Sequence, residues 1–225
     1  MPTPPEVPGK SRTFWLTFGI ALLIFGLIAA DVACHGQLAR WDLQLLIWLN
    51  THEPWSLVHF LSHLTKLGDP IVIVPVGILV GALLLVMKRW ADLVFWAAGL
   101  AGSWAITMGL KTLFARPRPV ELAFFPMNPG YSFPSGHTIA IVVSAGLAGH
   151  LVGSAARRQW PRLFLAHHAA TLCALGGGIV VGISLVAVCV HYPTDVLAGL
   201  ALGWAWVLVC GAARDALYHA KTRPV

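Results

Sequence analysis

Charged residues are scarce in this sequence. Asp, Glu, Lys and Arg together make up 11% of its 225 residues, whereas hydrophobic residues make up 57%. Soluble globular domains carry about one quarter charged residues. The composition therefore excludes an ordinary water-soluble protein.

Cysteine is also scarce, and no usual metal-binding pattern is present. The sequence has four cysteines, Cys34, Cys173, Cys189 and Cys210. Cys34 and Cys189 lie near the same predicted membrane face, so a disulfide is an alternative to the favoured interpretation, two unreactive apolar thiols. His59 and His63 stand four residues apart but lack a third ligand. We therefore expect no metal and no cofactor.

Six apolar runs are long enough to cross a hydrocarbon core of about 30 Å as helices. They lie at about residues 13–30, 70–87, 91–110, 135–153, 166–188 and 195–213. The first run could alternatively be a signal peptide, but it is long for one and lacks a cleavage site near Ala33. The sequence predicts an all-α, polytopic membrane protein with a six-helix domain over residues 13–213, flanked by cytoplasmic tails at 1–12 and 214–225.

Lysine and arginine are distributed unequally between the loops, which predicts the orientation. With the N-terminus inside, ten of these residues fall in inner segments and five in outer ones. Both termini are therefore expected in the cytoplasm, and the net charge of +6 indicates orientation, not nucleic-acid binding. The outer loop over 31–69 includes an amphipathic stretch at 54–68, which predicts a short helix in the outer interface.

Three polar stretches adjoin outer helix ends. They are KTLFARPRP (111–119), PSGH (134–137) and HYPTD (191–195). Each alone has an ordinary structural explanation: Lys111 and Arg118 could snorkel, His137 could cap a helix, and Asp195 could complement a helix dipole. Because the predicted topology places all three on one face, and ionisable groups at membrane depth are usually functional, we expect a shared site.

The residue types in these stretches suit phosphoryl transfer. Lysine and arginine bind phosphate oxygens, and Ser135 and Gly136 begin a helix whose unpaired N–H groups attract anions. His191 and Asp195 are four residues apart, so the carboxylate can accept from one imidazole nitrogen and leave the other as a nucleophile.

The spacing of these residues resembles the three-part signature of the type 2 phosphatidic acid phosphatase family, relatives of vanadium haloperoxidases. Six residues separate Lys111 from Arg118, PSGH is contiguous, and Ser184 precedes His191 and Asp195 at the family's spacing. The resemblance implies that His191 attacks phosphorus to form a phosphohistidine, that Asp195 orients it, and that His137 protonates the leaving oxygen. It implies phosphate binding by Lys111, Arg118, Ser135 and Gly136, with possible support from Arg116 and Ser184.

One position departs from the family pattern, since Leu185 stands where the family has a phosphate-binding arginine. The expected function is hydrolysis of a membrane lipid phosphate or diphosphate, of the polyprenyl diphosphate, phosphatidic acid or phosphatidylglycerol phosphate class. A lipid-to-lipid phosphotransferase is one alternative, and a non-catalytic lipid-phosphate binder or transporter, suggested by Leu185, is another. The expected location is a bacterial inner membrane with a periplasmic site; the expected partners are the lipid substrate and the bilayer, with no obligate protein partner.

Overall fold

The computed structural model describes residues 12–126, 130–159 and 164–221, and within 154–159, 164–171 and 218–221 it describes only the course of the helix. Most of the predicted N-terminal tail and the last four residues of the C-terminal one lie outside this part. The described residues contain no β-strand, so the predicted all-α class is confirmed.

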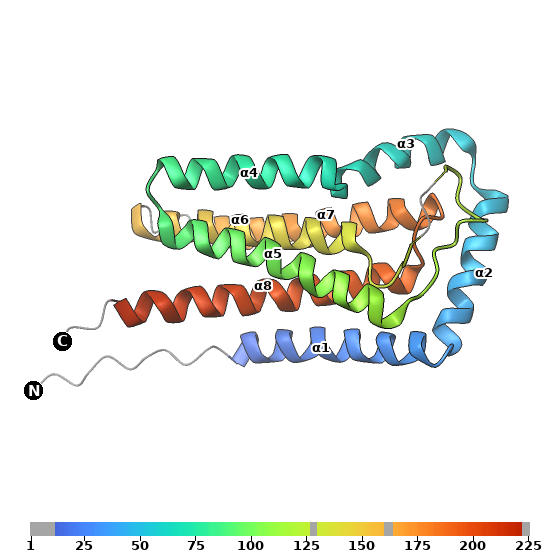
Figure 1. Ribbon diagram of the computed structural model, residues 1–225, viewed down its shortest axis with the longest axis horizontal. Helices are drawn as coiled ribbons and strands as arrows, with labels where there is room; N and C mark the ends of the chain where they lie inside the picture. Colours follow the sequence, from blue (N-terminus) through green and yellow to red (C-terminus); the bar gives the residue numbers. More distant parts are fainter. Residues whose placement is uncertain (1–11, 127–129, 160–163, 222–225) are drawn as a thin grey trace, which may run out of the picture.

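The helices follow one another along nearly the whole chain (Figure 1). They are α1 (Arg12–Ala33), α2 (Gln37–His52), α3 (Trp55–Thr65), α4 (Pro70–Val86), α5 (Trp90–Phe114), α6 (Gly136–Gln159), α7 (Phe164–Ala187) and α8 (Pro193–Lys221), with a 3₁₀ turn at Lys66–Gly68 before α4. Local signals account for several boundaries. Asp69 caps α4 by accepting from the Ile71 N–H at 2.9 Å, and Pro193 occupies the first turn of α8.

Five segments are long and apolar enough to cross a membrane. They are Arg12–Ala33, Trp55–Val86, Trp90–Phe114, Gly136–Gly153 and Pro193–Leu217. The described apolar part of α7, Leu172–Ala187, is shorter than a full span. The exact count of six crossings therefore stays a prediction. α8 continues as a helix through residues 214–221, so this part of the predicted C-terminal tail is helical, and its place in the cytoplasm stays a prediction.

Small residues let the central helices α5, α6 and α8 approach closely. A Cβ on Gly99 of α5 would lie 2.5 Å from Leu147 of α6, and one on Gly146 would lie 2.7 Å from Val207 of α8. The indole N–H of Trp206 donates to the Gly99 carbonyl at 2.8 Å. Close backbone contact of this kind is how helices associate where the hydrophobic effect is absent. It fixes the frame that carries the polar residues at the helix ends.

The predicted outer loop over 31–69 is mostly helical. α3 and the following turn coincide with the helix predicted at 54–68, whereas α2 was not foreseen and lies across the ends of the bundle helices (Figure 1). α2 exposes Trp41, Leu45 and Trp48 on one face and buries Asp42 and Leu46 on another. An interfacial position for either helix remains a prediction.

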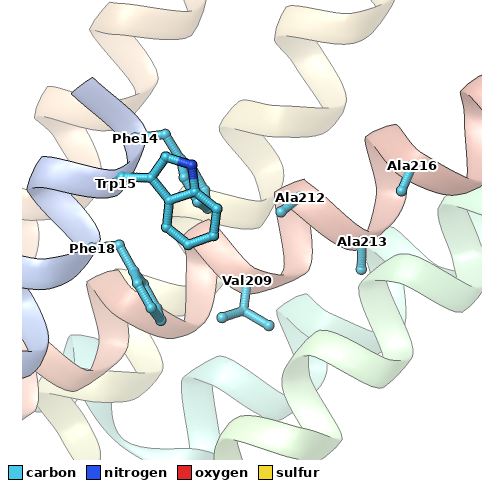
Figure 2. A pocket seen from close by; sticks show the side chains of 7 residues that line it. All are labelled: Phe14, Trp15, Phe18, Val209, Ala212, Ala213 and Ala216. Carbon is cyan, nitrogen blue, oxygen red and sulfur yellow. The ribbon is translucent and has the colours of Figure 1, made fainter. Parts of the chain in front are cut away.

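A pocket between α1 and α8 lies at the opposite end of the bundle from α2. Its volume is about 400 Å³, and Figure 2 shows the rings of Phe14, Trp15 and Phe18 facing small side chains of α8 such as Ala212 and Ala213. Nearly all of its lining is apolar, and none of its side chains suits phosphate chemistry. The candidate site lies elsewhere.

Candidate active site

The structure brings the three polar stretches together at one end of the bundle. The end of α5, the start of α6 and the turn from α7 to α8 meet there, beside α2 (Figure 1). The Ser135 N–H donates to the Asp195 carbonyl at 3.0 Å, and the rings of His137 and His191 lie 6.2 Å apart between centroids. Residues separated by up to 84 positions, from Lys111 to Asp195, thus share one small region.

His191 and Asp195 form a fully buried pair. The imidazole Nδ1 lies 3.1 Å from Asp195 Oδ2, and the same oxygen accepts from the Tyr192 N–H at 3.1 Å. His191 Nε2 is buried and has no hydrogen-bond partner among the described residues. The carboxylate therefore favours the tautomer that carries its proton on Nδ1, which leaves the Nε2 lone pair available.

The turn after α7 holds His191 in this position. The N–H groups of Val190 and His191 donate to the Leu185 carbonyl at 2.9 and 3.3 Å, and Cys189 adopts a left-handed conformation with φ of 55°. This resembles a Schellman ending, in which a left-handed residue satisfies the last carbonyls of a helix. The turn reverses the chain and places His191 two residues before Pro193, where α8 begins.

Burial lowers the pKa of His191 from its ordinary value of 6.5, because the charged imidazolium loses its water. The hydrogen bond and charge of Asp195 oppose this effect, whereas the positive charges of Arg118 and Lys111 reinforce it. A neutral imidazole is the form that can attack an electrophile, and this environment preserves it.

The predicted phosphate ligands surround the same point. Lys111, in the last turn of α5, donates from Nζ to the Tyr131 and Ser132 carbonyls at 2.6 and 3.1 Å. Arg118 has a buried Nε without a hydrogen-bond partner in the described part of the chain, and burial lowers the pKa of its guanidinium while Asp195 opposes that shift. Two cations therefore border the site, and the Arg118 Nε is an unsatisfied donor.

The start of α6 supplies a further anion-binding element. Ser135 precedes the helix, and its Oγ accepts from the Thr138 N–H at 3.4 Å, as an N-cap does. A Cβ on Gly136 would lie 3.8 Å from Lys111 Cε, so the helix start adjoins the lysine. The positive end of the α6 dipole thus lies beside Lys111, where the two can attract the same anion. Ser135 acts mainly as the cap of this helix.

His137 lies against a backbone segment that the sequence did not point to. A Cβ on Gly68 would come within 2.9 Å of His137 Cβ and 3.2 Å of its Cα. Because any larger residue at position 68 would displace His137, the 3₁₀ turn before α4 fixes the start of α6. The only sequence signal was a glycine at the end of a predicted helix.

The two residues predicted as support make different contacts. Ser184 is buried and its hydroxyl donates to the Val181 carbonyl within α7 at 2.7 Å. Arg116 forms ion pairs with Asp195 and with Asp42, an acidic residue that the sequence analysis missed. The signal for Asp42 was available, since it shares a helical face with Leu46 and Leu49, both buried.

The cysteines show the favoured arrangement. Cys34 is exposed, Cys189 is buried, and both are free thiols, so the alternative of a disulfide between them is wrong. Burial raises the pKa of Cys189 to about 11, which keeps it an unreactive thiol. Among the described residues, no group of three or more metal-binding side chains comes together.

The chain is similar in sequence to known proteins. The model of the PAP2 superfamily matches residues 92–217, more than half of the chain. A phosphatidylglycerophosphatase B of Bacillus subtilis is 30% identical over 154 residues, covering 67% of this chain and 71% of its own. An undecaprenyl-diphosphatase of Sulfolobus acidocaldarius is 28% identical over 201 residues, covering 84% of this chain and 87% of its own.

Two solved structures share the fold. The crystal structure of a transmembrane PAP2-type phosphatidylglycerolphosphate phosphatase from Bacillus subtilis superposes with a TM-score of 0.76 at 21% identity, covering 89% of this chain and 96% of its own. That of Aquifex aeolicus LpxE gives a TM-score of 0.53 at 22% identity, covering 77% and 94%. At these identities the likeness concerns the fold alone.

Proposed function

The chain belongs to the PAP2 superfamily, and on that premise we propose that it hydrolyses the phosphate or diphosphate group of a membrane lipid through a phosphohistidine formed on His191. The observation that carries the proposal is the buried His191–Asp195 pair. Its His191 Nε2 has no hydrogen-bond partner among the described residues, and the ring of His137 lies 6.2 Å from that of His191 between centroids. The relatives' names, phosphatidylglycerophosphatase B and undecaprenyl-diphosphatase, support a membrane lipid as the substrate class.

The first chemical step breaks a P–O bond and forms a P–N bond. His191 Nε2 attacks phosphorus, and Asp195 stabilises the positive charge that develops on the imidazole. Protonated His137 gives its proton to the departing lipid oxygen, or to the departing phosphate of a diphosphate. Lys111, Arg118 and the N–H groups at the start of α6 stabilise the charge on the three remaining oxygens.

The second step returns the enzyme to its starting state. Water attacks phosphorus, neutral His137 accepts one of its protons, and the P–N bond breaks to release inorganic phosphate. Both electrons of that bond return to His191 Nε2, while Nδ1 keeps its proton, hydrogen-bonded to Asp195 Oδ2. Each histidine thus ends in the protonation state in which it began, and no metal takes part in either step.

We further propose a bacterial inner membrane with six crossings, α7 being the fifth, cytoplasmic termini and a periplasmic site. The start of α1 and the end of α8 lie at the end of the bundle opposite the site, as this topology requires (Figure 1). A site at a membrane face can receive a lipid headgroup while the acyl or prenyl chains remain in the bilayer.

We expect purified enzyme in EDTA to release inorganic phosphate from at least one member of a panel containing a polyprenyl diphosphate, a phosphatidic acid and a phosphatidylglycerol phosphate. Phosphate release is measured in mixed-lipid vesicles together with transfer of label to other lipids. Transfer without release would indicate the phosphotransferase, and activity lost in EDTA but restored by one divalent metal would contradict the metal-free mechanism.

Leu185 gives a second prediction. Its side chain is 1% exposed, and its carbonyl accepts from the His191 N–H, so position 185 adjoins the nucleophile. We expect Leu185→Arg to raise kcat/KM about tenfold, because a guanidinium there adds a charge-assisted contact to the phosphoryl group. Leu185→Gln, polar but uncharged, is the matched control. Equal or lower activity in a folded Leu185→Arg protein would show that leucine is adapted to the substrate.

A further inference from the structure

Asp42 is a buried acidic residue that the proposed mechanism does not use. It lies on α2, outside the PAP2-matched region, and its exposed fraction is 3%. Burial raises the pKa of its carboxyl, whereas hydrogen bonds from Thr194 and Arg116 oppose this rise. A buried carboxylate is costly unless it is paired, so the identity of its partners is informative.

All partners of Asp42 belong to the catalytic end of the bundle. Its Oδ2 accepts from Arg116 Nη2 at 2.8 Å and from the Thr194 hydroxyl, and its Oδ1 accepts from the Thr194 N–H at 3.1 Å. Thr194 immediately precedes Asp195 in the first turn of α8. Asp42 therefore holds both the backbone and the side chain of the residue next to Asp195.

Arg116 connects Asp42 with Asp195 directly. Its Nη1 donates to Asp195 Oδ1 at 2.8 Å and to the Thr194 hydroxyl at 2.8 Å, while its Nη2 donates to Asp42 Oδ2. The guanidinium lies 3.9 Å above the Tyr192 ring, which fixes its plane. The other oxygen of Asp195 contacts His191. Asp42, Arg116, Asp195 and His191 therefore form one continuous chain of contacts.

We propose that Asp42 and Arg116 are positioning residues that orient Asp195 and thereby aim His191 Nε2 at phosphorus. The inference rests on the proposed nucleophilic role of His191. The planar guanidinium of Arg116 holds its donors at fixed separations and directions, so it can hold two carboxylates in a defined geometry, whereas the ammonium of a lysine is a compact point charge. The ion pair with Asp42 also holds Arg116 on the side of Asp195 away from His191. Lys111 and Arg118 therefore remain the cations that face the phosphate.

The proposal predicts a loss of kcat with little change in KM. In Asp42→Asn the phosphate ligands are intact, but Arg116 and Thr194 lose their charged anchor, so we expect kcat to fall about tenfold. The groups around His191 are Asp195 on α8, Lys111 on α5, His137 on α6 and Arg118 in the loop after α5, with Arg116 and Asp42 behind Asp195. Asp42→Asn removes one negative charge from this set, which makes the imidazolium of His191 less favourable.

The pH profile separates positioning from a merely structural role. We expect the acid limb of kcat/KM in Asp42→Asn to move to lower pH by about half a pH unit. The double variant Asp42→Asn/Arg116→Gln loses one negative and one positive charge. The acid limb of kcat/KM should therefore return toward its wild-type position, while kcat stays low. The two kcat losses should also be non-additive, because both changes break the same chain of contacts.

Two further proteins complete the experiment. Asp31→Asn is the matched control, because Asp31, in the last turn of α1, accepts from the Ala39 N–H of α2 at 2.9 Å but does not belong to this chain of contacts. We expect wild-type kcat and a wild-type pH profile from it. Arg116→Lys keeps the positive charge but changes the geometry of the contacts with Asp42 and Asp195, so it tests the proposal if Asp42→Asn does not fold. It should lower kcat about tenfold with the acid limb unmoved.

Each outcome supports or overturns the inference. A folded Asp42→Asn protein with the kcat and acid limb of wild type would overturn it, as would a wild-type kcat in Arg116→Lys. Wild-type enzyme is assayed alongside on the lipid phosphate panel and on p-nitrophenyl phosphate. If wild type itself releases no phosphate, the proposed function fails and the inference falls with it; if wild type is active and the variants match it, only the inference fails.

Discussion

Replacing His191 with asparagine is expected to lower kcat by at least about 10⁴-fold, with the fold and lipid binding retained. The asparagine amide can replace Nδ1 as the donor to Asp195 Oδ2, which lies 3.1 Å from it in the wild type. It offers no lone pair at the place of Nε2, so the P–N bond cannot form. Turnover on the best lipid of the panel, equilibrium binding of that lipid and thermal unfolding measure the three expectations.

His59→Asn is the control for this substitution. His59 is exposed on α3, where its ring stacks edge-to-face on His63 at 5.0 Å between centroids, away from the site. We expect wild-type turnover from it. A His191→Asn protein that is folded and retains more than about one per cent of wild-type kcat would remove His191 from the role of nucleophile.

Replacing His137 with asparagine is expected to produce a loss that depends on the leaving group. For a lipid phosphate the leaving alkoxide needs a proton, so phosphorylation of the enzyme should slow about 10²- to 10⁴-fold. For p-nitrophenyl phosphate the leaving group is stable as an anion, so the same step should slow less than about tenfold. Rapid-mixing measurement of the first turnover on both substrates tests this difference.

The second step should remain slow in His137→Asn with either substrate, because water loses its base. We therefore expect a burst of nitrophenolate, one per enzyme molecule, followed by a slow steady state. Equal losses for both leaving groups would contradict the general-acid role and indicate that His137 acts mainly by electrostatics or packing. Ser62→Ala is a control for the purification and assay, because Ser62 lies on α3 and its hydroxyl donates within that helix, to the His59 carbonyl at 2.7 Å.

The sequence predicts the spanning helices well because lipid imposes a simple requirement. Apolar length decides which segments cross, and the runs at 70–87, 91–110 and 195–213 fall within or close to α4, α5 and α8. The helix ends are predicted less well. α8 continues to Lys221, past the predicted apolar run, and Arg214 in this extension pairs with Asp92 of α5, a long-range contact that hydropathy does not contain.

The site is predictable where its residues lie in ordered motifs and not where they depend on tertiary contact. Lys111, His137 and His191 stand at recognisable spacings, and the fold brings their stretches together. Asp42 is a single carboxylate in a segment read as an outer loop, so only the structure shows that α2 turns it toward Arg116. Gly68 likewise has no visible role until the turn before α4 is seen against His137.

Trapping the phosphoenzyme is the measurement that shows whether the phosphoryl group is transferred to His191. His137→Asn is mixed with p-nitrophenyl phosphate, quenched in alkali to preserve phosphohistidine, digested and mapped by mass spectrometry. We expect one phosphoryl group on the peptide containing His191, and none in His137→Asn/His191→Asn. Phosphate on another residue, or a first turnover of product without any phosphoenzyme, would contradict it.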